Sequence, residues 1–136
     1  MQTYWKVGIA MLASAGLGGL AVHAVHAQAK PPVYLVTEID VTNPEAYGKE
    51  FAPKAQATIK AAGGRQLAIG GAGGAGAKPI TVLGGEGTAP KRLVIQLWES
   101  ADAMNKWYNS ADYQEALKIG KQYATFRRLA VEGVAP

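Results

Sequence analysis

The stretch VYLVTEIDVTNPEAY, residues 33–47, joins two periodicities and decides the fold. Apolar and polar side chains alternate over residues 33–41, which predicts a strand whose odd-numbered positions form the more apolar face. Helix-start signals follow at once, because Thr42 or Asn43 can cap a helix and Pro44 fits its first turn. The domain is therefore predicted to begin with a strand that leads directly into a helix.

The predicted helix presents an apolar stripe in which every fourth residue belongs to one face. The stripe consists of Tyr47, Phe51, Ala55 and Ile59. Pro53 lies within this pattern and should bend or split the helix, since proline lacks the N–H that a helix interior requires. The pair Gly63-Gly64 should end it. One apolar helix face is thus available to cover a sheet.

Downstream, strand and helix patterns recur in an order that specifies the topology. Strands are predicted at residues 65–69, 92–98 and 128–134, with further extended structure at residues 79–83. Ser100 and Ser110 each cap a helical piece, and the glycine-rich segment Gly70–Ala77 is expected to be a flexible loop. The order β-α-β-β-α-β predicts an α+β fold, a four-stranded antiparallel sheet with both helices on one face. If the other face is apolar it must meet a partner, and a two-fold homodimer is the simplest solution.

The first 29 residues have the order of a secretory signal peptide. Lys6 precedes a continuous apolar stretch, and a small-x-small site stands at Ala27-Gln28-Ala29. Cleavage is predicted after Ala29, which would export the protein to the periplasm. The alternative is a retained membrane anchor, since the apolar stretch is just long enough to span, although it is rich in Gly and Ala. Residues 30–32 would then be a leader to one domain at residues 33–134.

Removal of this segment would restrict the chemistry of the mature chain. Both histidines, His23 and His26, lie within it, and the chain has no cysteine. The mature protein would therefore lack the residues for Ser-His-Asp or Cys-His catalysis, disulfides, and zinc or haem ligation, so no metal or cofactor is expected. The net charge of +4 is mild and the basic residues are scattered, with doublets only at Lys91-Arg92 and Arg127-Arg128. Nucleic acid binding is therefore not expected.

The segments "VYLVTEIDVTNPEAY", "AAGGR", "RLVIQLWES", "WYNSADYQEA" and "VEGV" resemble, in this order, a small bacterial family known as domain of unknown function 1330. The resemblance implies a ferredoxin-like domain of the dimeric α+β barrel superfamily, in which two sheets face each other across a dimer axis and ligands often lie between sheet and helices. It implies no established activity. Where the family usually carries an arginine, an acidic residue and a second arginine, this chain has Ile69, Gln96 and Gly120. The loop Gly70–Ala77 looks like an insertion.

The stretch WYNSADY, residues 107–113, is the densest group of candidate functional side chains. A structural interpretation accounts for three of them: Trp107 fills the core, Asn109 ends one helical piece and Ser110 caps the next. It explains Tyr108 and Tyr113 less well, because buried phenol hydroxyls need hydrogen-bond partners. Core packing and ligand binding therefore both stay open for the two tyrosines.

Two functions are compatible with the sequence, beside a third and less specific one, a purely structural or stress-related domain. The first is a binding or accessory protein that holds a small organic molecule or a partner without metal. The second is a cofactor-independent enzyme, with proton transfer and anion binding supplied by Tyr34, Arg65, Glu99, Tyr108 and Tyr113. Arg65 could bind a carboxylate or pair internally, and Glu99 stands at a strand end, where site residues are common.

Two other patterns are interpreted as structural. GAGGAG, residues 71–76, matches the dinucleotide-binding GxGxxG, but the segment after it is extended and provides no helix N-terminus for a pyrophosphate. Glu38 and Asp40 share one strand face without further acids nearby, which favours a solvated face or a pair with a strand lysine.

Overall fold

A computed structural model of the chain describes residues 30–72 and 74–134, so the predicted signal peptide lies outside the described residues. The alternating segment forms strand β1 (Val33–Val41) with the predicted bounds. Its odd-numbered side chains are buried and its even-numbered side chains are half-buried or exposed. The difference shows which face the helices cover.

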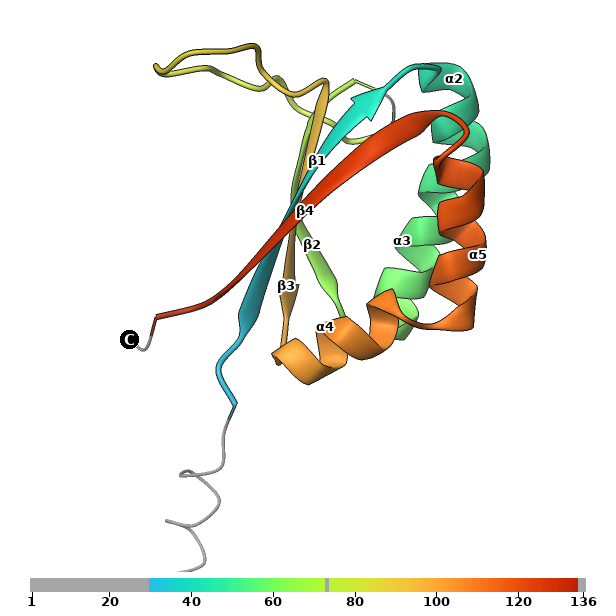
Figure 1. The fold of residues 1–136 in the computed structure, drawn as a ribbon, viewed down its shortest axis with the longest axis vertical. Coiled ribbons are helices and arrows are strands. Elements are labelled where there is room, and N and C mark those ends of the chain that lie inside the picture. Colours follow the sequence, from blue (N-terminus) through green and yellow to red (C-terminus); the bar gives the residue numbers. More distant parts are fainter. Residues whose placement is uncertain (1–29, 73, 135–136) are drawn as a thin grey trace, which may run out of the picture. The chain divides into compact units, whose positions relative to one another are not determined.

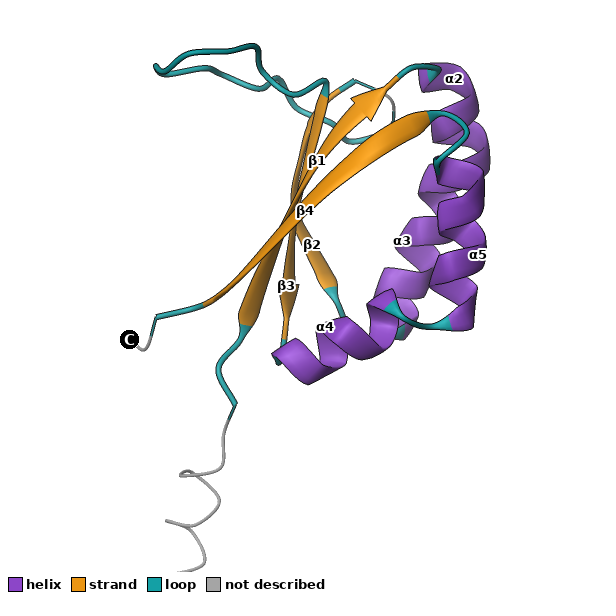
Figure 2. Ribbon diagram, in the orientation of Figure 1, coloured by secondary structure: helices purple, strands orange, loops and turns teal. Residues whose placement is uncertain are grey.

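Strand β1 lies inside a four-stranded antiparallel sheet of order β2-β3-β1-β4 (Figure 1). Its neighbours are β3 (Arg92–Trp98) and β4 (Ala124–Glu132), and β2 (Arg65–Gly71) extends the sheet beyond β3. All helices lie on one side of this sheet (Figure 2). The predicted α+β, ferredoxin-like arrangement is confirmed.

The first helical segment begins with the predicted cap. The side chain of Asn43 accepts a hydrogen bond of 3.1 Å from the backbone N–H of Ala46, and α2 (Pro44–Ala46) follows. A wide π-helical turn (Tyr47–Phe51) then leads into α3 (Ala52–Ala61). The helix is thus split, as predicted.

Pro53 gives the physical reason for the split. It stands in the first turn of α3, where a missing N–H costs little, and the irregular turn directly precedes it. The apolar stripe nevertheless remains on one side, since all four of its members are buried: Tyr47, Phe51, Ala55 and Ile59.

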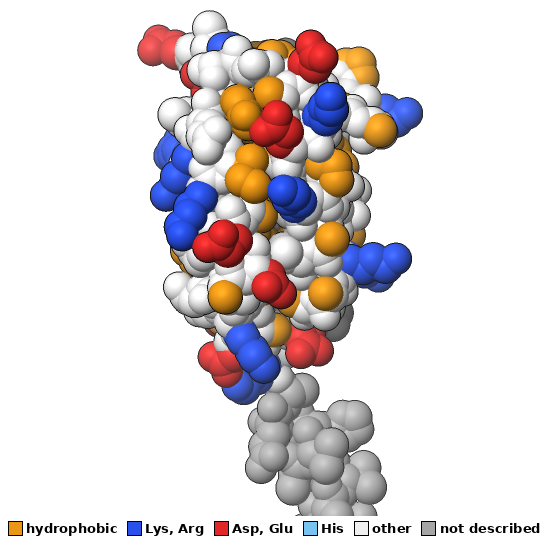
Figure 3. All heavy atoms as spheres, turned by 90° about the vertical axis from the view of Figure 1, so that its right-hand side faces the viewer, with side chains coloured by type: hydrophobic (Ala, Val, Ile, Leu, Met, Phe, Trp, Pro, Cys, Tyr) orange, Lys and Arg blue, Asp and Glu red, His pale blue; other side chains and the backbone are white. Residues whose placement is uncertain are grey.

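The second helical segment consists of α4 (Ala101–Tyr108) and α5 (Ala111–Gly120). Ser100 caps α4 by accepting from the N–H of Ala103 at 3.1 Å, and Ser110 caps α5 in the same way. The surface on the helical side carries acidic and basic side chains intermixed with scattered apolar ones (Figure 3). Within the described part of the chain, no helix has the length and apolar character needed to cross a membrane.

Three segments differ from the sequence prediction. Strand β2 continues to Gly71, because Gly70 and Gly71, predicted to begin the flexible loop, pair with Leu93 and Arg92 of β3. Residues 79–83 join no strand of the sheet; the segment before them meets the outer edge of β2 only at an isolated bridge between Gly70 and Lys78. Strand β4 begins at Ala124 rather than at residue 128, because Ala124 pairs with Val41 and so the full length of β1 is matched.

The two faces of the sheet differ in composition. The face toward the helices carries the core, including Trp98, which is 1% exposed, and Val94. On the other face, two rows of apolar side chains cross β3, β1 and β4 in register, and all of them are half-buried or exposed. These rows, the open-face patch, are Leu97–Tyr34–Val131 and Ile95–Val36–Leu129.

Ion pairs border this patch near one end of β1. Glu38 lies 3.2 Å from Arg127, and Asp40 lies 2.8 Å from Lys91. The carboxylates that share one strand face are therefore paired with cations of the neighbouring strands, as the structural interpretation of Glu38 and Asp40 predicted.

Candidate functional site

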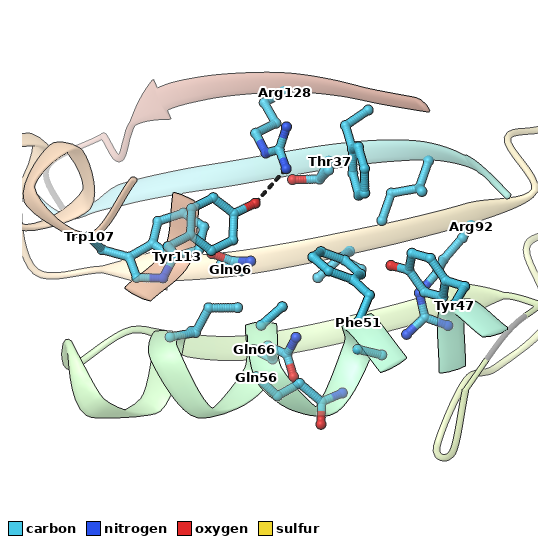
Figure 4. A pocket seen from close by; sticks show the side chains of 16 residues that line it. Thr37, Tyr47, Phe51, Gln56, Gln66, Arg92, Gln96, Trp107, Tyr113 and Arg128 are labelled. Atoms are coloured by element: carbon cyan, nitrogen blue, oxygen red, sulfur yellow. Dashed lines mark hydrogen bonds between the residues drawn. The ribbon is translucent and has the colours of Figure 1, made fainter. Parts of the chain in front are cut away.

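A small cavity of about 40 Å³ lies between the inner face of the sheet and the helices (Figure 4). Its wall is mixed, with apolar residues such as Phe51 and Ile59 interrupted by polar groups. The polar groups are Thr37, Tyr47, Gln56, Gln66, Arg92, Gln96, Tyr113 and Arg128. Among the described residues that line it, none is acidic and the only cations are the two arginines. The cavity is therefore rich in hydrogen-bond donors.

Tyr113 and Arg128 form a direct hydrogen bond at this cavity (Figure 4). The guanidinium of Arg128 donates to the phenol oxygen of Tyr113, so the hydroxyl proton of Tyr113 is left to donate elsewhere. Burial raises the pKa of Tyr113, and the nearby Arg128 charge opposes this only in part. Tyr113 is therefore a neutral phenol at physiological pH, a donor rather than a base.

Gln96 and Thr37 supply further donors from the sheet. The indole N–H of Trp98 donates to Gln96 Oε1 at 3.0 Å, and since indole cannot accept, the amide NH₂ of Gln96 is directed to the other side. Gln96 is 4% exposed and Thr37 is 5% exposed. Neither the amide nitrogen of Gln96 nor the hydroxyl of Thr37 has a hydrogen-bond partner within residues 30–72 and 74–134.

The other end of the cavity is formed by Arg92. Its guanidinium donates to the carbonyl of Ala72 at 3.1 Å and lies 5.4 Å from the ring centre of Tyr47. Burial raises the pKa of Tyr47, while Arg92 lowers it by charge and hydrogen bonding, so burial dominates. A Cβ at Gly74 would lie 3.1 Å from a guanidinium nitrogen. The glycine-rich segment thus packs closely against Arg92.

An open groove of about 400 Å³ adjoins the cavity beside α4 and β4. It shares Phe126 and Arg128 with the cavity, and its wall is a mixture of apolar and polar surface that also includes Leu35, Met104, Asn105, Tyr108 and Ala130. The Arg128 guanidinium lies 5.5 Å from the ring centre of Tyr108 and 4.7 Å from that of Phe126. Arg128 therefore faces both hollows.

The structure brings together two of the five predicted candidates. Tyr113 lines the cavity, Tyr108 lines the groove, and their ring centres are 5.8 Å apart. Tyr34 belongs to the open-face patch, Arg65 is exposed at the start of β2, and Glu99 is exposed after β3. These three lie away from the cavity, since strand alternation or exposure directs them elsewhere, so only Tyr108 and Tyr113 of the five lie close to each other.

The residues interpreted as structural in WYNS have structural contacts. Trp107 is 2% exposed and its indole N–H donates to the Thr58 hydroxyl at 3.0 Å. Asn109 follows α4 and its side chain donates to the carbonyl of Asn105 at 2.9 Å. Ser110 donates to the carbonyl of Trp107 at 2.6 Å and caps α5. These contacts hold the joint between the two helices.

Of the polar residues that line the cavity, only Tyr113 was among the predicted site residues; Thr37, Gln96 and Arg128 are three of those that sequence reasoning missed. Each follows from the two-residue period of a strand, because Thr37 is odd-numbered in β1, and Gln96 and Arg128 share a face with Trp98 and Phe126. Alternation alone could have assigned them to the helix-covered face.

Two of the positions that depart from the resembled family are packed against neighbours. A Cβ at Gly120 would come within 2.7 Å of the Phe51 ring, so a larger side chain does not fit there without rearrangement. Ile69 packs against the core. Neither position contributes to the cavity wall, whereas Gln96 does.

Comparison with known proteins yields a family and a set of similar folds. The sequence model of the family described as "Domain of unknown function (DUF1330)" matches residues 32–134. No curated protein is significantly similar to the chain. A structure of a protein of unknown function from Rhodopseudomonas palustris is 16% identical, with a TM-score of 0.57 and coverage of 83% of this chain and 94% of that one.

A second similar structure is SnoaB, described as a cofactor-independent oxygenase from Streptomyces nogalater. It is 14% identical, with a TM-score of 0.51, and the match covers 78% of this chain and 96% of SnoaB. At this identity the likeness concerns the fold.

Proposed function

We propose that this chain, which belongs to the DUF1330 family, binds a small polar organic molecule in the cavity between sheet and helices. The observation that carries the proposal is the set of hydrogen-bond donors that line the cavity and have no acceptor among the described residues. The amide of Gln96 and the hydroxyl of Thr37 face the cavity with their hydrogen-bonding capacity unused among the described residues. Buried polar groups normally have partners, so a bound molecule or water is expected to supply them.

A cofactor-independent enzyme is the second candidate, and the name of SnoaB raises it. Such an enzyme needs a group that takes up a proton. The described residues that line the cavity include no Asp, Glu, His, Cys or Lys, and Tyr113 and Tyr47 hold their protons because burial raises the pKa of both. The donors could stabilise a negative charge on a ligand. Binding is therefore the better supported function.

Native mass spectrometry of the protein purified from its own cells would test the binding function. The expected result is a small organic molecule that is retained in gentle conditions and released on denaturation. A protein that carries no molecule, and that shifts its melting temperature with none of a set of small organic acids, amides and phenols, would contradict the proposal.

A homodimer assembled through the open-face patch is part of the proposal. Six apolar side chains in two registered rows form that patch, and a surface of this kind is expected to meet a partner. A second copy provides a self-complementary surface by two-fold symmetry. Light scattering should give the dimer mass at micromolar concentration, and a monomer mass there would contradict this assembly.

Export to the periplasm is also proposed, from the signal-peptide order of residues 1–29. The mass of the purified protein should then correspond to a chain that begins at Lys30. Recovery of the full-length chain in the membrane fraction would favour a retained anchor instead.

A further inference from the structure

The doublet Arg127-Arg128 places two cations on opposite faces of β4, because side chains alternate along a strand. Arg127 lies on the open face and pairs with Glu38 at 3.2 Å. Arg128 lies on the inner face, where it hydrogen bonds to the Tyr113 phenol and stacks near the rings of Phe126 and Tyr108. Every contact that the described residues make with the Arg128 guanidinium is with an uncharged group.

Among the described residues, no acidic side chain forms an ion pair with Arg128. Neither the cavity nor the groove has an acidic residue in its described lining. A partly buried cation is stabilised by an anion, and arginine binds a carboxylate through two parallel hydrogen bonds. An anionic ligand group placed at Arg128 would therefore neutralise a positive charge that the described residues leave unpaired.

The neighbouring polar groups favour the same kind of ligand group. The Tyr113 hydroxyl accepts from Arg128 and so has its proton to give, and the Gln96 amide is oriented NH₂-outward by its bond from Trp98. These donors and the Thr37 hydroxyl line the same cavity as Arg128. A carboxylate has only acceptors, and it fits a site that consists of donors.

The size and the lining of the groove indicate what the rest of the ligand should be. The cavity of about 40 Å³ has room for a head group only, whereas the adjoining groove of about 400 Å³ is within the size range of small-molecule sites. Beyond Arg128 and Asn105, its walls are the apolar or aromatic side chains of Leu35, Met104, Tyr108, Phe126 and Ala130. The body of the ligand is thus expected to be apolar.

We propose that cavity and groove together bind an organic carboxylic acid in its ionised form, with the carboxylate on Arg128 and the apolar body against Tyr108 and Met104. This inference rests on the proposed binding function and names its ligand class. It also gives Tyr108 a role as a groove wall that an aromatic or aliphatic body can contact.

Calorimetry with two matched probes, benzoate and benzamide, tests the charge preference. Both carry the same ring, and they differ in whether the head group is an anion. The wild-type protein should bind benzoate at least about tenfold more tightly than benzamide, because hydrogen bonds to charged groups are the stronger ones. This comparison requires no variant and so does not depend on the folding of a mutant.

Variants then assign the preference to one residue. Arg128→Gln should remove the preference for benzoate, whereas the adjacent Arg127→Gln, on the open face, should keep it. Tyr108→Ala should weaken both probes, because it removes groove contact with the ring that the two probes share. Circular dichroism checks that each variant is folded.

Equal affinity for the two probes would overturn the carboxylate assignment and leave the binding function intact, since that function is judged by a retained molecule in native mass spectrometry. Failure of both probes at millimolar concentration would overturn the assignment as well. The assignment would also be refuted if Arg127→Gln lost the preference for benzoate while Arg128→Gln kept it. The anion would then bind on the open face of the sheet.

Discussion

The two faces of one sheet differ in what completes them. The inner face is covered by α3 and α5 of the same chain, and its large residues are buried, with Trp98 1% exposed. The open face has the same strands and a comparable apolar content, yet Leu129 is 47% exposed and Val131 is 63% exposed. Alternation along a strand can therefore reveal that a face is apolar. It does not show whether the helices of the same chain cover that face, which becomes clear only from the packing.

Truncation of the largest inner-face side chain should produce the largest effect. Trp98→Ala removes a ring that contacts Trp107 at 5.0 Å between centroids and releases its hydrogen bond to Gln96. We expect a loss of about 3–5 kcal/mol in the free energy of unfolding, as for other buried aromatics. Urea denaturation measures it.

The control Val131→Ala, on the open face and measured where the protein is monomeric, should change the free energy by less than about 0.5 kcal/mol. Equal losses would remove the distinction between the faces.

A charge on the open face should alter assembly rather than folding. Leu129→Lys puts an ammonium in the row Ile95–Val36–Leu129, and burying it against a second copy is costly. The dimer dissociation constant should rise by about tenfold or more, which corresponds to about 1.4 kcal/mol. Light scattering over a dilution series measures it.

Leu83→Lys is the matched control for this prediction. Leu83 is 97% exposed in the loop before β3, outside the patch, so the same substitution there should leave the mass unchanged. An unchanged mass for Leu129→Lys would show that the open face is not the dimer surface.

Adding a single methyl group should show that the helical layer is tightly packed and that the loops are not. Gly120→Ala places a Cβ within 2.7 Å of the Phe51 ring, and overpacking of this kind costs about 1–3 kcal/mol, offset in part by the better helix propensity of alanine. We expect a net loss of about 1 kcal/mol in urea denaturation. Gly84→Ala meets no atom within 4 Å and should be neutral. A stabilised Gly120→Ala would show that the helices have room to separate.

The smallest expected effect belongs to the ion pair on the open face. A double-mutant cycle with Glu38→Gln and Arg127→Gln should give a coupling of about 0.2–1 kcal/mol, because solvent screens both side chains. The coupling should decrease at high salt. A larger coupling that is insensitive to salt would indicate that the pair is buried in the assembled protein.

Much of the fold could be predicted because it depends on local signals. The bounds of β1 and β3, the caps Asn43, Ser100 and Ser110, and the split at Pro53 each follow from neighbouring residues. The start of β4 could not be predicted, because it is set by pairing with Val41 in a distant strand. Residues 79–83 have the composition of extended structure, yet the chain leaves the edge of β2 after the single bridge at Lys78.

The candidate site was predicted only where the sequence was unusual. Tyr113 and Tyr108 stood out in the sequence because they belong to an aromatic cluster. Thr37 and Gln96 are ordinary strand residues. They become part of the site because the helices enclose both of them and a hydrogen bond from Trp98 orients Gln96. Arg128 was noted only as part of a doublet. Its difference from Arg127 becomes visible when both faces of the sheet are known.

The same doublet has a consequence for how the chain finds its strand alignment. A slip of β4 by one residue would bring Arg128 opposite Glu38 in place of Arg127, so the ion pair does not discriminate the native alignment from its nearest competitor. Discrimination comes instead from the inner-face contacts of β4, above all from Phe126, whose ring packs 5.3 Å from that of Phe51 and would be moved to the open face by the slip. Replacement of Phe126 should therefore produce misaligned chains during refolding.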